Sequence, residues 1–378
     1  MKHFESRTFA VAMLLACPLA TAAPFVYIAQ PNNGTIAVVD AANNSITGSI
    51  AVSDSSIALA ITHSGAKAYV ALAQSRAICR VDLADKRVEA TLPMTGVPIA
   101  LVLDKDDSRL FVANSGDAST LTVIDAATFS VAATVALPDK PWALALAPTG
   151  SRLYTLFAPA AAIVGVVDIS TSSYHVLPNL SNRPDLWPSG FAVNADGTKI
   201  YVANWAYISG FDPPPGSDVV TVIDTSAATA VRSISVGDQV TDVSLDAQTG
   251  DAYVAAYAHV AVIDAQRQAV KASVAVTAGS SGVVFEPVRR RLYVPNYRGD
   301  LVTVIDPSTS SVLTTLAISG PGAIAVAPAA LGAATTVGAV PMLSSALQIA
   351  LALALALVGT MPAARRRLWP YAQMRRTG

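Results

Sequence analysis

Cysteine, histidine and charged residues are all scarce in this sequence. Its 378 residues include 2 cysteines and 4 histidines, and only 13% are Asp, Glu, Lys or Arg. Cys17 lies in an N-terminal leader, so after removal of the leader Cys79 has no disulfide partner. Because Cys79 sits in the apolar stretch AICRVD, we expect a buried thiol rather than a catalytic one. Stability must then come from apolar burial instead of cross-links.

Recognisable catalytic and cofactor motifs are also missing. His63, His175 and His259 show no HxH or HExxH spacing, so no metal site is predicted. The sequence contains no Walker loop, no Gly-x-Ser-x-Gly and no dinucleotide-binding fingerprint, so no cofactor is expected.

Positive charge is too sparse for a nucleic-acid-binding surface. Residues 23–330 contain 18 Lys and Arg against 25 Asp and Glu, so this part of the chain is acidic. An acidic domain lacks the basic footprint that binds phosphate backbones, and nucleic acid is not an expected partner. The run Arg289-Arg290-Arg291 is a local exception, for which we predict a solvated hairpin.

What the chain does contain is one unit, repeated. Phe111–Leu137 reads as three short apolar runs separated by turns at Asn114–Asp117 and Asp125–Thr128, the pattern of hairpin-linked strands. Starts like its FVAN recur 40 to 52 residues apart, close to the ~40–45 residues of a four-stranded propeller blade. The starts are at Tyr27, Tyr69, Phe111, Tyr154, Tyr201, Tyr253 and Tyr293.

The order of strands predicts how the ring closes. An apolar strand, often introduced by Pro, follows each three-strand unit, as in PIALVLD from Pro98. At the start of the mature chain, the unit that begins at Tyr27 has no apolar strand before it. At the other end, Pro321–Pro328 is an apolar strand with no three-strand unit after it. If the two ends pair, they complete one blade and cover two sheet edges. The prediction is an all-β, seven-bladed propeller of four-stranded antiparallel blades, with the blade starting at Tyr154 irregular.

These repeats resemble the YVTN family of β-propeller repeats, and the resemblance covers Tyr27–Pro328. The segments FVANSGDASTLTVIDAAT, YVANWAYISGFDPPPGSDVVTVIDTS and YVPNYRGDLVTVIDPSTSSVLTTLAI carry it best. The wider superfamily of seven-bladed propellers includes sugar lactonases. An enzyme of that type would need acidic, His and Arg groups converging at the central channel. The inner strands here are dominated by Ala, Val, Leu and Ile, with Asp242 and Glu286 as exceptions.

An aspartate closes the second run of each of the seven units. A catalytic carboxylate is needed once or twice, whereas these occur at the same place in every blade. An Asp at this position accepts hydrogen bonds from turn amides two residues on, so a structural role is predicted. The seven are Asp40, Asp82, Asp125, Asp168, Asp224, Asp264 and Asp306.

Both ends of the chain look like targeting segments. Residues 1–22 combine Lys2 and Arg7, an apolar run and Ala20-Thr21-Ala22, which predicts an export signal cleaved before Ala23. Leu14-Leu15-Ala16-Cys17 also resembles a lipobox, so a lipoprotein signal is an alternative.

After the propeller at 23–330, residues 331–341 form a linker. Residues 342–361 are uncharged and long enough to span a bilayer, and 362–378 form a basic tail expected in the cytoplasm. The segment from Val340 through the span to the Arg cluster resembles an IPTL-type C-terminal sorting signal of Gram-negative bacteria, although Met342 stands where Thr is usual. The expected location is the periplasmic side of the inner membrane or the cell surface.

Two long insertions mark one face of the predicted ring. Residues 178–188 and 204–218 both interrupt the repeat at loops that share this end of the propeller, here called the insertion face. Aromatic and Arg residues on irregular loops are typical of binding surfaces. The predicted ligand-binding residues are Trp142, Arg183, Asp185, Trp187, Trp205, Tyr207, Phe211, Asp212, Tyr257, His259, Tyr297 and Arg298.

The sequence therefore predicts a monomeric, membrane-tethered propeller that acts as a binding or scaffold module in the bacterial envelope. Its partner is expected to be an envelope protein or a glycan. Two alternatives stay open: a periplasmic lactonase-like enzyme, and a structural role for the Trp residues as plugs between blades.

Overall fold

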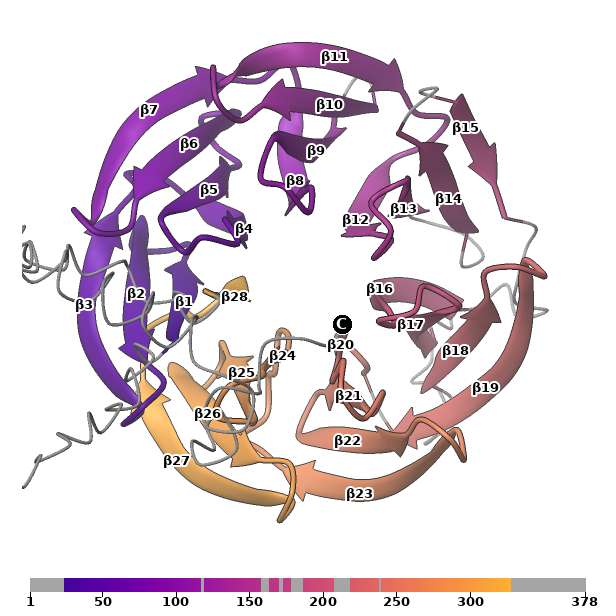
Figure 1. Cartoon of the computed structure of the whole chain (residues 1–378). Coiled ribbons are helices and arrows are strands. Elements are labelled where there is room, and N and C mark those ends of the chain that lie inside the picture. The colour runs from indigo at the N-terminus through magenta and orange to yellow at the C-terminus, as the bar shows by residue number, and fades with distance from the viewer. Residues whose placement is uncertain are drawn as a thin grey trace, which may run out of the picture. The chain divides into compact units, whose positions relative to one another are not determined.

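A computed structural model describes residues 24–116, 119–157, 163–169, 173–177, 186–206, 218–237 and 239–327. The chain divides into two units, Met1–Ala330 and Leu331–Gly378, and all described residues lie in the first. Figure 1 shows that these residues form a ring of small sheets around a central axis.

The ring consists of seven antiparallel sheets of four strands, which confirms the predicted seven-bladed propeller. Blade 1 contains β28 and β1–β3, and blades 2 to 7 follow in chain order with four consecutive strands each. The strands are β1 (Phe25–Gln30), β2 (Thr35–Asp40), β3 (Ser45–Ala51), β4 (Ser56–Ile61), β5 (Lys67–Leu72), β6 (Ala77–Asp82), β7 (Arg87–Pro93), β8 (Val97–Leu103), β9 (Arg109–Ser115), β10 (Thr120–Asp125), β11 (Ser130–Ala136), β12 (Pro141–Leu146), β13 (Arg152–Phe157), β14 (Ile163–Asp168), β15 (Ser173–Val176), β16 (Leu186–Val193), β17 (Lys199–Ala206), β18 (Asp218–Asp224), β19 (Thr229–Gly237), β20 (Asp242–Leu245), β21 (Ala252–Ala256), β22 (His259–Asp264), β23 (Ala269–Ala275), β24 (Val284–Glu286), β25 (Arg291–Asn296), β26 (Leu301–Asp306), β27 (Ser311–Ala317) and β28 (Ile324–Val326).

The ring closes between the first and last described strands. β28 pairs antiparallel with β1, with Ile28 opposite Ile324 and Val26 opposite Val326. Backbone bonds continue beyond the pair: the Ala29 N–H donates to Ala323 O at 2.8 Å. Figure 1 shows β28 beside β1 at the inner end of blade 1. The prediction that both chain ends share one blade is confirmed.

Apolar cores lie between neighbouring blades rather than inside any one sheet. On β17, Ile200 and Val202 pack with blade 4, whereas the alternate residues Tyr201 and Ala203 pack with blade 6. Side chains alternate across a strand, so a strand covered on both faces needs apolar residues at every position. This explains the unbroken apolar runs in the sequence. Blade 4 is complete, but its outer strand β15 has only 4 residues.

The aspartates that end the third strands organise the turns. Asp264 Oδ1 accepts the Gln266 and Arg267 N–H groups at 2.9 and 2.7 Å, and these bonds lower the pKa of Asp264. Equivalent backbone bonds occur at five more of the seven aspartates, Asp40, Asp82, Asp125, Asp224 and Asp306. Asp168 also has a partner. The turns then reverse through a residue with positive φ, such as Gln268 at 48°.

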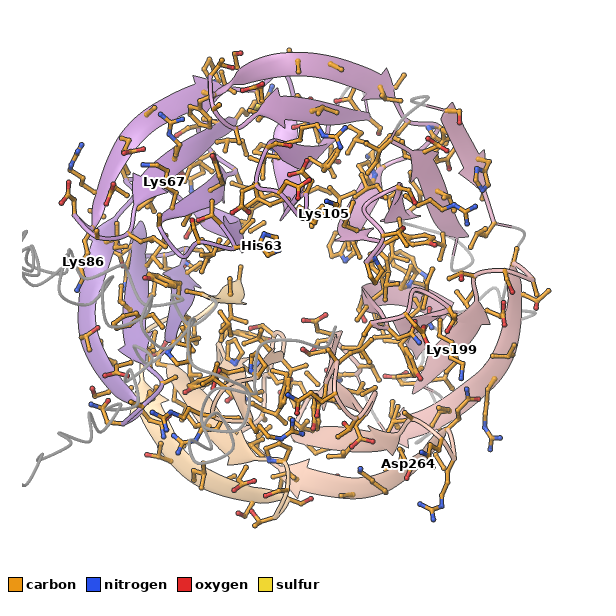
Figure 2. All side chains as sticks on the ribbon, viewed as in Figure 1. His63, Lys67, Lys86, Lys105, Lys199 and Asp264 are labelled. Carbon is orange, nitrogen blue, oxygen red and sulfur yellow. The ribbon has the colours of Figure 1, made fainter. Side chains whose placement is uncertain are left out.

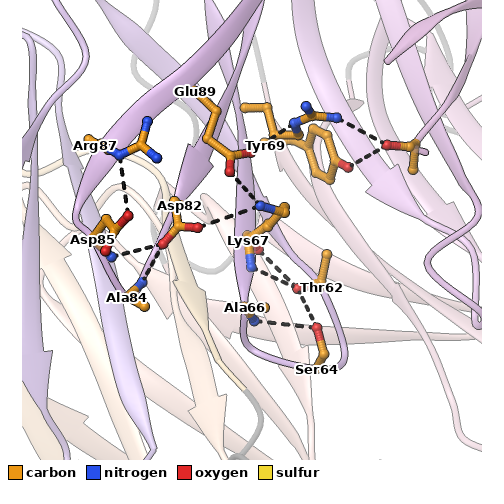
Figure 3. Close-up of polar contacts among 12 residues, drawn as sticks. Thr62, Ser64, Ala66, Lys67, Tyr69, Asp82, Ala84, Asp85, Arg87 and Glu89 are labelled. Carbon is orange, nitrogen blue, oxygen red and sulfur yellow. Dashed lines mark hydrogen bonds and ion pairs between the residues drawn. The ribbon is translucent and has the colours of Figure 1, made fainter. Parts of the chain in front are cut away.

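The repeated Tyr connects neighbouring blades at the seam between blades 2 and 3. The Tyr69 hydroxyl of blade 2 donates to Ala126 O of blade 3 at 3.4 Å, and Arg80 Nη1 donates to the same oxygen at 3.3 Å (Figure 3). Ala126 directly follows the turn aspartate of blade 3. Arg80 also lies 4.9 Å from the centre of the Phe129 ring. Two repeat features, the Tyr and the Asp turn, therefore meet across a seam.

The basic hairpin after β24 is not simply solvated, so that prediction is wrong in part. Arg290 forms an ion pair with the buried Asp246 and lies 5.3 Å from the Phe285 ring centre. Arg291 donates to Ala41 O of blade 1 at 3.4 Å. Periodic sequence patterns do not reveal such contacts, because the acceptors come from neighbouring blades.

The predicted targeting segments lie outside the described residues. This applies to the export signal at 1–22, the linker at 331–341, the span at 342–361 and the basic tail at 362–378. Within the described part of the chain, no helix has the length and apolarity to cross a bilayer.

Candidate functional site

The structure describes seven of the twelve predicted binding residues. Trp142, Trp187, Trp205, Tyr257, His259, Tyr297 and Arg298 lie at strand ends or turns on the insertion face. Arg183, Asp185, Tyr207, Phe211 and Asp212 lie outside the described residues.

The two tryptophans of blade 5 form a pair. Trp187 on β16 lies opposite Trp205 on β17 in the strand register. Their ring centroids are 5.9 Å apart with an interplanar angle of 61°, an edge-to-face geometry. Both rings are half-buried. The strands next to the two predicted insertions are thus in contact through this aromatic pair.

Trp142 presents the most open aromatic surface of the site. It sits at a β-bulge between Pro141 and Ala143, where the register between β12 and β13 shifts. The bulge turns its side chain out of the ladder, and 54% of the residue is exposed. Its indole N–H donates to Ser189 O of blade 5 at 3.0 Å. This bond fixes the ring between blades 4 and 5 while leaving a large apolar area facing solvent.

His259 connects blades 5 and 6. Its Nε2 lies 2.7 Å from Val236 O, so the ring carries its proton on Nε2 and donates to that carbonyl. The ring lies over Gly237, where a Cβ would come within 2.4 Å of Cε1. Gly237 also has φ +122°, a conformation that favours glycine. The local backbone is therefore shaped to receive the imidazole.

Arg298 forms a polar cluster with two tyrosines at the seam between blades 6 and 7. Its Nη1 donates to the Tyr257 hydroxyl at 2.6 Å, and its Nε donates to the Tyr297 hydroxyl at 3.2 Å. The guanidinium carbon is 5.3 Å from the Tyr257 ring centre and 5.8 Å from that of Tyr297. The hydrogen bond to Tyr297 is the main reason that the pKa of Arg298 is raised. The cluster is a fixed cation.

These contacts join four consecutive blades. The bond from Trp142 crosses from blade 4 to blade 5, His259 crosses from blade 6 to blade 5, and Arg298 crosses from blade 7 to blade 6. We call Trp142, Trp187, Trp205, Tyr257, His259, Tyr297 and Arg298 the aromatic arc. Aromatic faces with a few fixed donors suit stacking and hydrogen bonding to a ligand.

Sequence reasoning missed two contributors to this region. Ser189, the bulge residue of β16, accepts the Trp142 bond and donates from Oγ to Val240 O at 2.9 Å. Asp242, the second contributor, stands out in the sequence only as an acidic exception on an apolar inner strand, with no sign of its buried position. Its Oδ1 accepts the Val243 N–H at 2.8 Å, and burial raises the pKa of its carboxyl to about 6. A Cβ on Gly190 would come within 2.4 Å of Asp242 Oδ1, so the glycine makes room for the carboxylate.

The described residues offer no cluster of three His, Cys, Asp or Glu that could hold a metal ion. Glu286, the other acidic exception, is fully buried and accepts the Val288 and Arg289 N–H groups at 2.6 and 2.7 Å. It therefore serves a turn. Cys79 is buried, and burial raises the pKa of its thiol to about 12, which keeps it protonated.

Away from the insertion face, His63 is bound to Asp107, with Nδ1 and Oδ1 2.7 Å apart. Figure 2 shows His63 and Lys105 near the central opening.

No family model matches this sequence, and no curated protein matches it either. The fold is nevertheless similar to solved structures. Hydrazine synthase from Kuenenia stuttgartiensis is 20% identical with a TM-score of 0.66, covering 79% of this chain and 99% of that one. A functionally unknown protein from Desulfotomaculum acetoxidans DSM 771 is 13% identical with a TM-score of 0.65, covering 80% of this chain and 98% of that one.

Dihydro-heme d1 dehydrogenase NirN, solved in complex with DHE, is 13% identical with a TM-score of 0.59. That match covers 81% of this chain and 75% of NirN. At these identities the likeness establishes the propeller fold alone.

Proposed function

We propose that this chain is a YVTN-type propeller that is exported, tethered to the membrane by residues 342–361, and binds a protein or glycan of the bacterial envelope through the aromatic arc. The observation that carries the proposal is that Trp142, His259 and Arg298 each make a hydrogen bond across a different seam, and that these three seams are consecutive. Structural plugs would be expected at every seam, whereas these residues gather on four of the seven blades beside the two insertions.

The arc also leaves surface for a ligand. Trp142 is 54% exposed and Tyr297 is 49% exposed, although each has a protein contact that fixes its position. Large aromatic side chains that are held in place lose little conformational entropy on binding, which makes them efficient contact residues.

The proposal is tested with the full-length chain, purified in detergent and immobilised. The double variant Trp187→Ala with Trp205→Ala should capture less of a specific envelope component from extract, while the melting temperature changes little. The matched control is Leu313→Ala, which removes an exposed apolar side chain from the outer strand β27. A large fall in melting temperature with unchanged capture would support the plug interpretation and contradict the proposal.

Location is tested separately. We expect the propeller, but not the C-terminal tail, to be digested when protease is added to cells whose outer membrane is permeabilised. In right-side-out inner-membrane vesicles the periplasmic face is exposed to added protease, so protection of the propeller from digestion there would contradict export.

A further inference from the structure

The cluster around Arg298 is assembled from three separate chain segments. Tyr257 comes from the turn between β21 and β22, Gly279 from the connection between β23 and β24, and Tyr297 with Arg298 from the turn between β25 and β26. Backbone bonds lock the segments together, because the Gly279 N–H donates to Tyr257 O at 2.8 Å and the Tyr297 N–H donates to Gly279 O at 3.0 Å. The arrangement is therefore built by the fold and does not depend on one flexible loop.

Gly279 provides the surface on which the arginine stem lies. A Cβ at this position would come within 2.9 to 3.3 Å of Arg298 Cγ, Cβ and Cδ. Gly279 also has φ +91°, so another residue would be strained. The stem passes over this glycine, and the guanidinium emerges between the two tyrosine rings. Its orientation is consequently fixed before any ligand arrives.

The cluster has hydrogen-bond donors to spare, whereas both of its acceptor atoms, the two tyrosine hydroxyl oxygens, already accept a bond from Arg298. A guanidinium has five N–H groups, and the two bonds to tyrosine use two of them, which leaves three. Each tyrosine oxygen accepts one of these bonds, so each hydroxyl hydrogen is left to donate elsewhere. Donors of this kind, converging around a positive charge, match the lone pairs of a carboxylate, phosphate or sulfate group.

The charge of Arg298 is also uncompensated within the described part of the chain. Its neighbour Asp300 accepts the Gly320 N–H with Oδ1 at 2.7 Å, and no described carboxylate forms an ion pair with Arg298. Arg290, by contrast, is paired with Asp246. An arginine held in place, exposed and without a carboxylate partner is a site for an external anion.

We propose that Arg298, Tyr257 and Tyr297 form an oxyanion-binding site, and that the ligand of the aromatic arc is a glycan carrying carboxylate, phosphate or sulfate groups. This inference rests on the proposed binding function and adds the charge and the chemical class of the ligand. A glycan is favoured over a protein partner because the arc combines exposed ring faces, which stack on sugar rings, with this single cationic clamp.

The test uses full-length protein and four probes: oligogalacturonate, the same oligomer as its methyl ester, inorganic phosphate and inorganic sulfate. The ester keeps the sugar rings but lacks the charge. The variants are Arg298→Gln, Tyr257→Phe and Tyr297→Phe. Arg267→Gln is the matched control, because Arg267 is an exposed arginine paired with Asp264. Figure 2 shows Asp264 at the outer part of the ring. Affinity is measured by calorimetry at low salt.

We expect at least one anion to bind, with about a tenfold loss in Arg298→Gln and a smaller loss in the two Phe variants. Arg267→Gln should bind like the wild-type chain. An equal loss in Arg267→Gln, or no loss in Arg298→Gln, would overturn the site, as would the failure of every anion to bind.

Failure of this inference is distinguishable from failure of the proposed function. If Arg298→Gln captures the envelope component as well as the wild-type chain, while Trp187→Ala with Trp205→Ala does not, binding by the arc stands and the oxyanion site does not. If binding of the ester equals that of oligogalacturonate, a neutral glycan is indicated and the proposed charge is wrong.

Discussion

The hydroxyl of Tyr293 donates a hydrogen bond of 2.8 Å to Asn44 Oδ1, although the two residues are 249 positions apart in the chain. Tyr293 belongs to blade 7 and Asn44 to the turn after β2 in blade 1. The closed ring is thus held by this contact between blades 7 and 1 as well as by the pairing of β28 with β1 inside blade 1. The contact follows the same rule as the seam between blades 2 and 3, where Tyr69 contacts the turn at Ala126.

Removing the Tyr293 hydroxyl should weaken the closing seam. We expect Tyr293→Phe to lower stability by about 1 kcal/mol, because a neutral hydrogen bond is lost and the Asn44 side chain must find water. Tyr69→Phe should cost less, since its bond to Ala126 O is 3.4 Å long. The measurement is the melting temperature of both variants under identical conditions. An equal or larger loss of stability in Tyr69→Phe would contradict the prediction that the Tyr293–Asn44 bond is the stronger of the two.

Arg80 should contribute more than any single hydroxyl to the seam between blades 2 and 3. It bonds Glu89 at 3.0 Å and Ala126 O at 3.3 Å (Figure 3). Its guanidinium also lies over the Phe129 ring. We expect Arg80→Met to destabilise the protein by about 1–3 kcal/mol, because charged hydrogen bonds and a cation–π contact are lost together. Thermal unfolding measures the effect. The more exposed Arg87 is the control, and Arg87→Met should be close to neutral.

The closing strand should be essential for folding. A chain that ends at Gly320 lacks Ile324 and Val326, each worth up to ~1.5–3 kcal/mol of apolar burial, and it leaves sheet edges uncovered. We expect this chain to aggregate or to melt at lower temperature than one that ends at Gly332. Size-exclusion chromatography and thermal unfolding compare the two. Similar melting of both chains would show that β28 is dispensable.

Asp242 should make stability fall as pH rises. Burial raises the pKa of its carboxyl to about 6 in the folded state, above the ordinary value of 3.8, so the folded protein holds this proton more tightly than the unfolded chain. The penalty for ionising it grows between about pH 4 and 6 and is complete above that range. We expect Asp242→Asn to raise stability by about 1–3 kcal/mol at pH 8 and by little at pH 4.

The control for this prediction is Asp106→Asn, at a well-exposed aspartate. The difference in melting temperature between variant and wild-type chain, measured from pH 4 to 8, should change with pH only for Asp242→Asn. A constant offset at all pH values would indicate a packing effect instead of titration.

Trp142 separates a binding role from a structural one. Because just over half of the residue is exposed, Trp142→Ala removes only part of the contact of a fully buried Trp, and we expect a loss of stability of about 1–2 kcal/mol, below the ~3–5 kcal/mol of a core Trp. Capture of the envelope component should nevertheless fall. Trp142→Phe keeps an aromatic face but loses the bond to Ser189 O, so its capture of the envelope component should lie between that of the wild-type chain and that of Trp142→Ala. Strong destabilisation by Trp142→Ala would indicate a plug between blades 4 and 5.

The repeat made the architecture predictable. An aromatic start, Tyr or Phe, and a terminal aspartate recur once per blade, so strand order, blade number and the pairing of β1 with β28 follow from counting. The lengthened period also predicts an insertion between β17 and β18, but its predicted start at residue 204 is too early, because β17 continues to Ala206. These features are local in sequence, and periodicity reports them directly.

Features that depend on contacts between blades were beyond the sequence. The bulges that turn Trp142 outwards and expose Ser189 O to its indole depend on strand register, which a single sequence does not specify. The clamp of Arg298 needs Gly279 and Tyr257 from other segments, and the raised pKa of Asp242 depends on the neighbouring blades that bury it.

The shared first blade has a consequence for biosynthesis. Because β28 is the final described strand, a growing chain can complete six blades while the molecule is still an open arc. Only when Ile324 reaches Ile28 does β1 gain its inner neighbour and blade 1 its fourth strand. Translation that stops just short of this point yields a polypeptide with almost every contact in place but with the inner edge of β1 unpaired, the state that the chain ending at Gly320 reproduces.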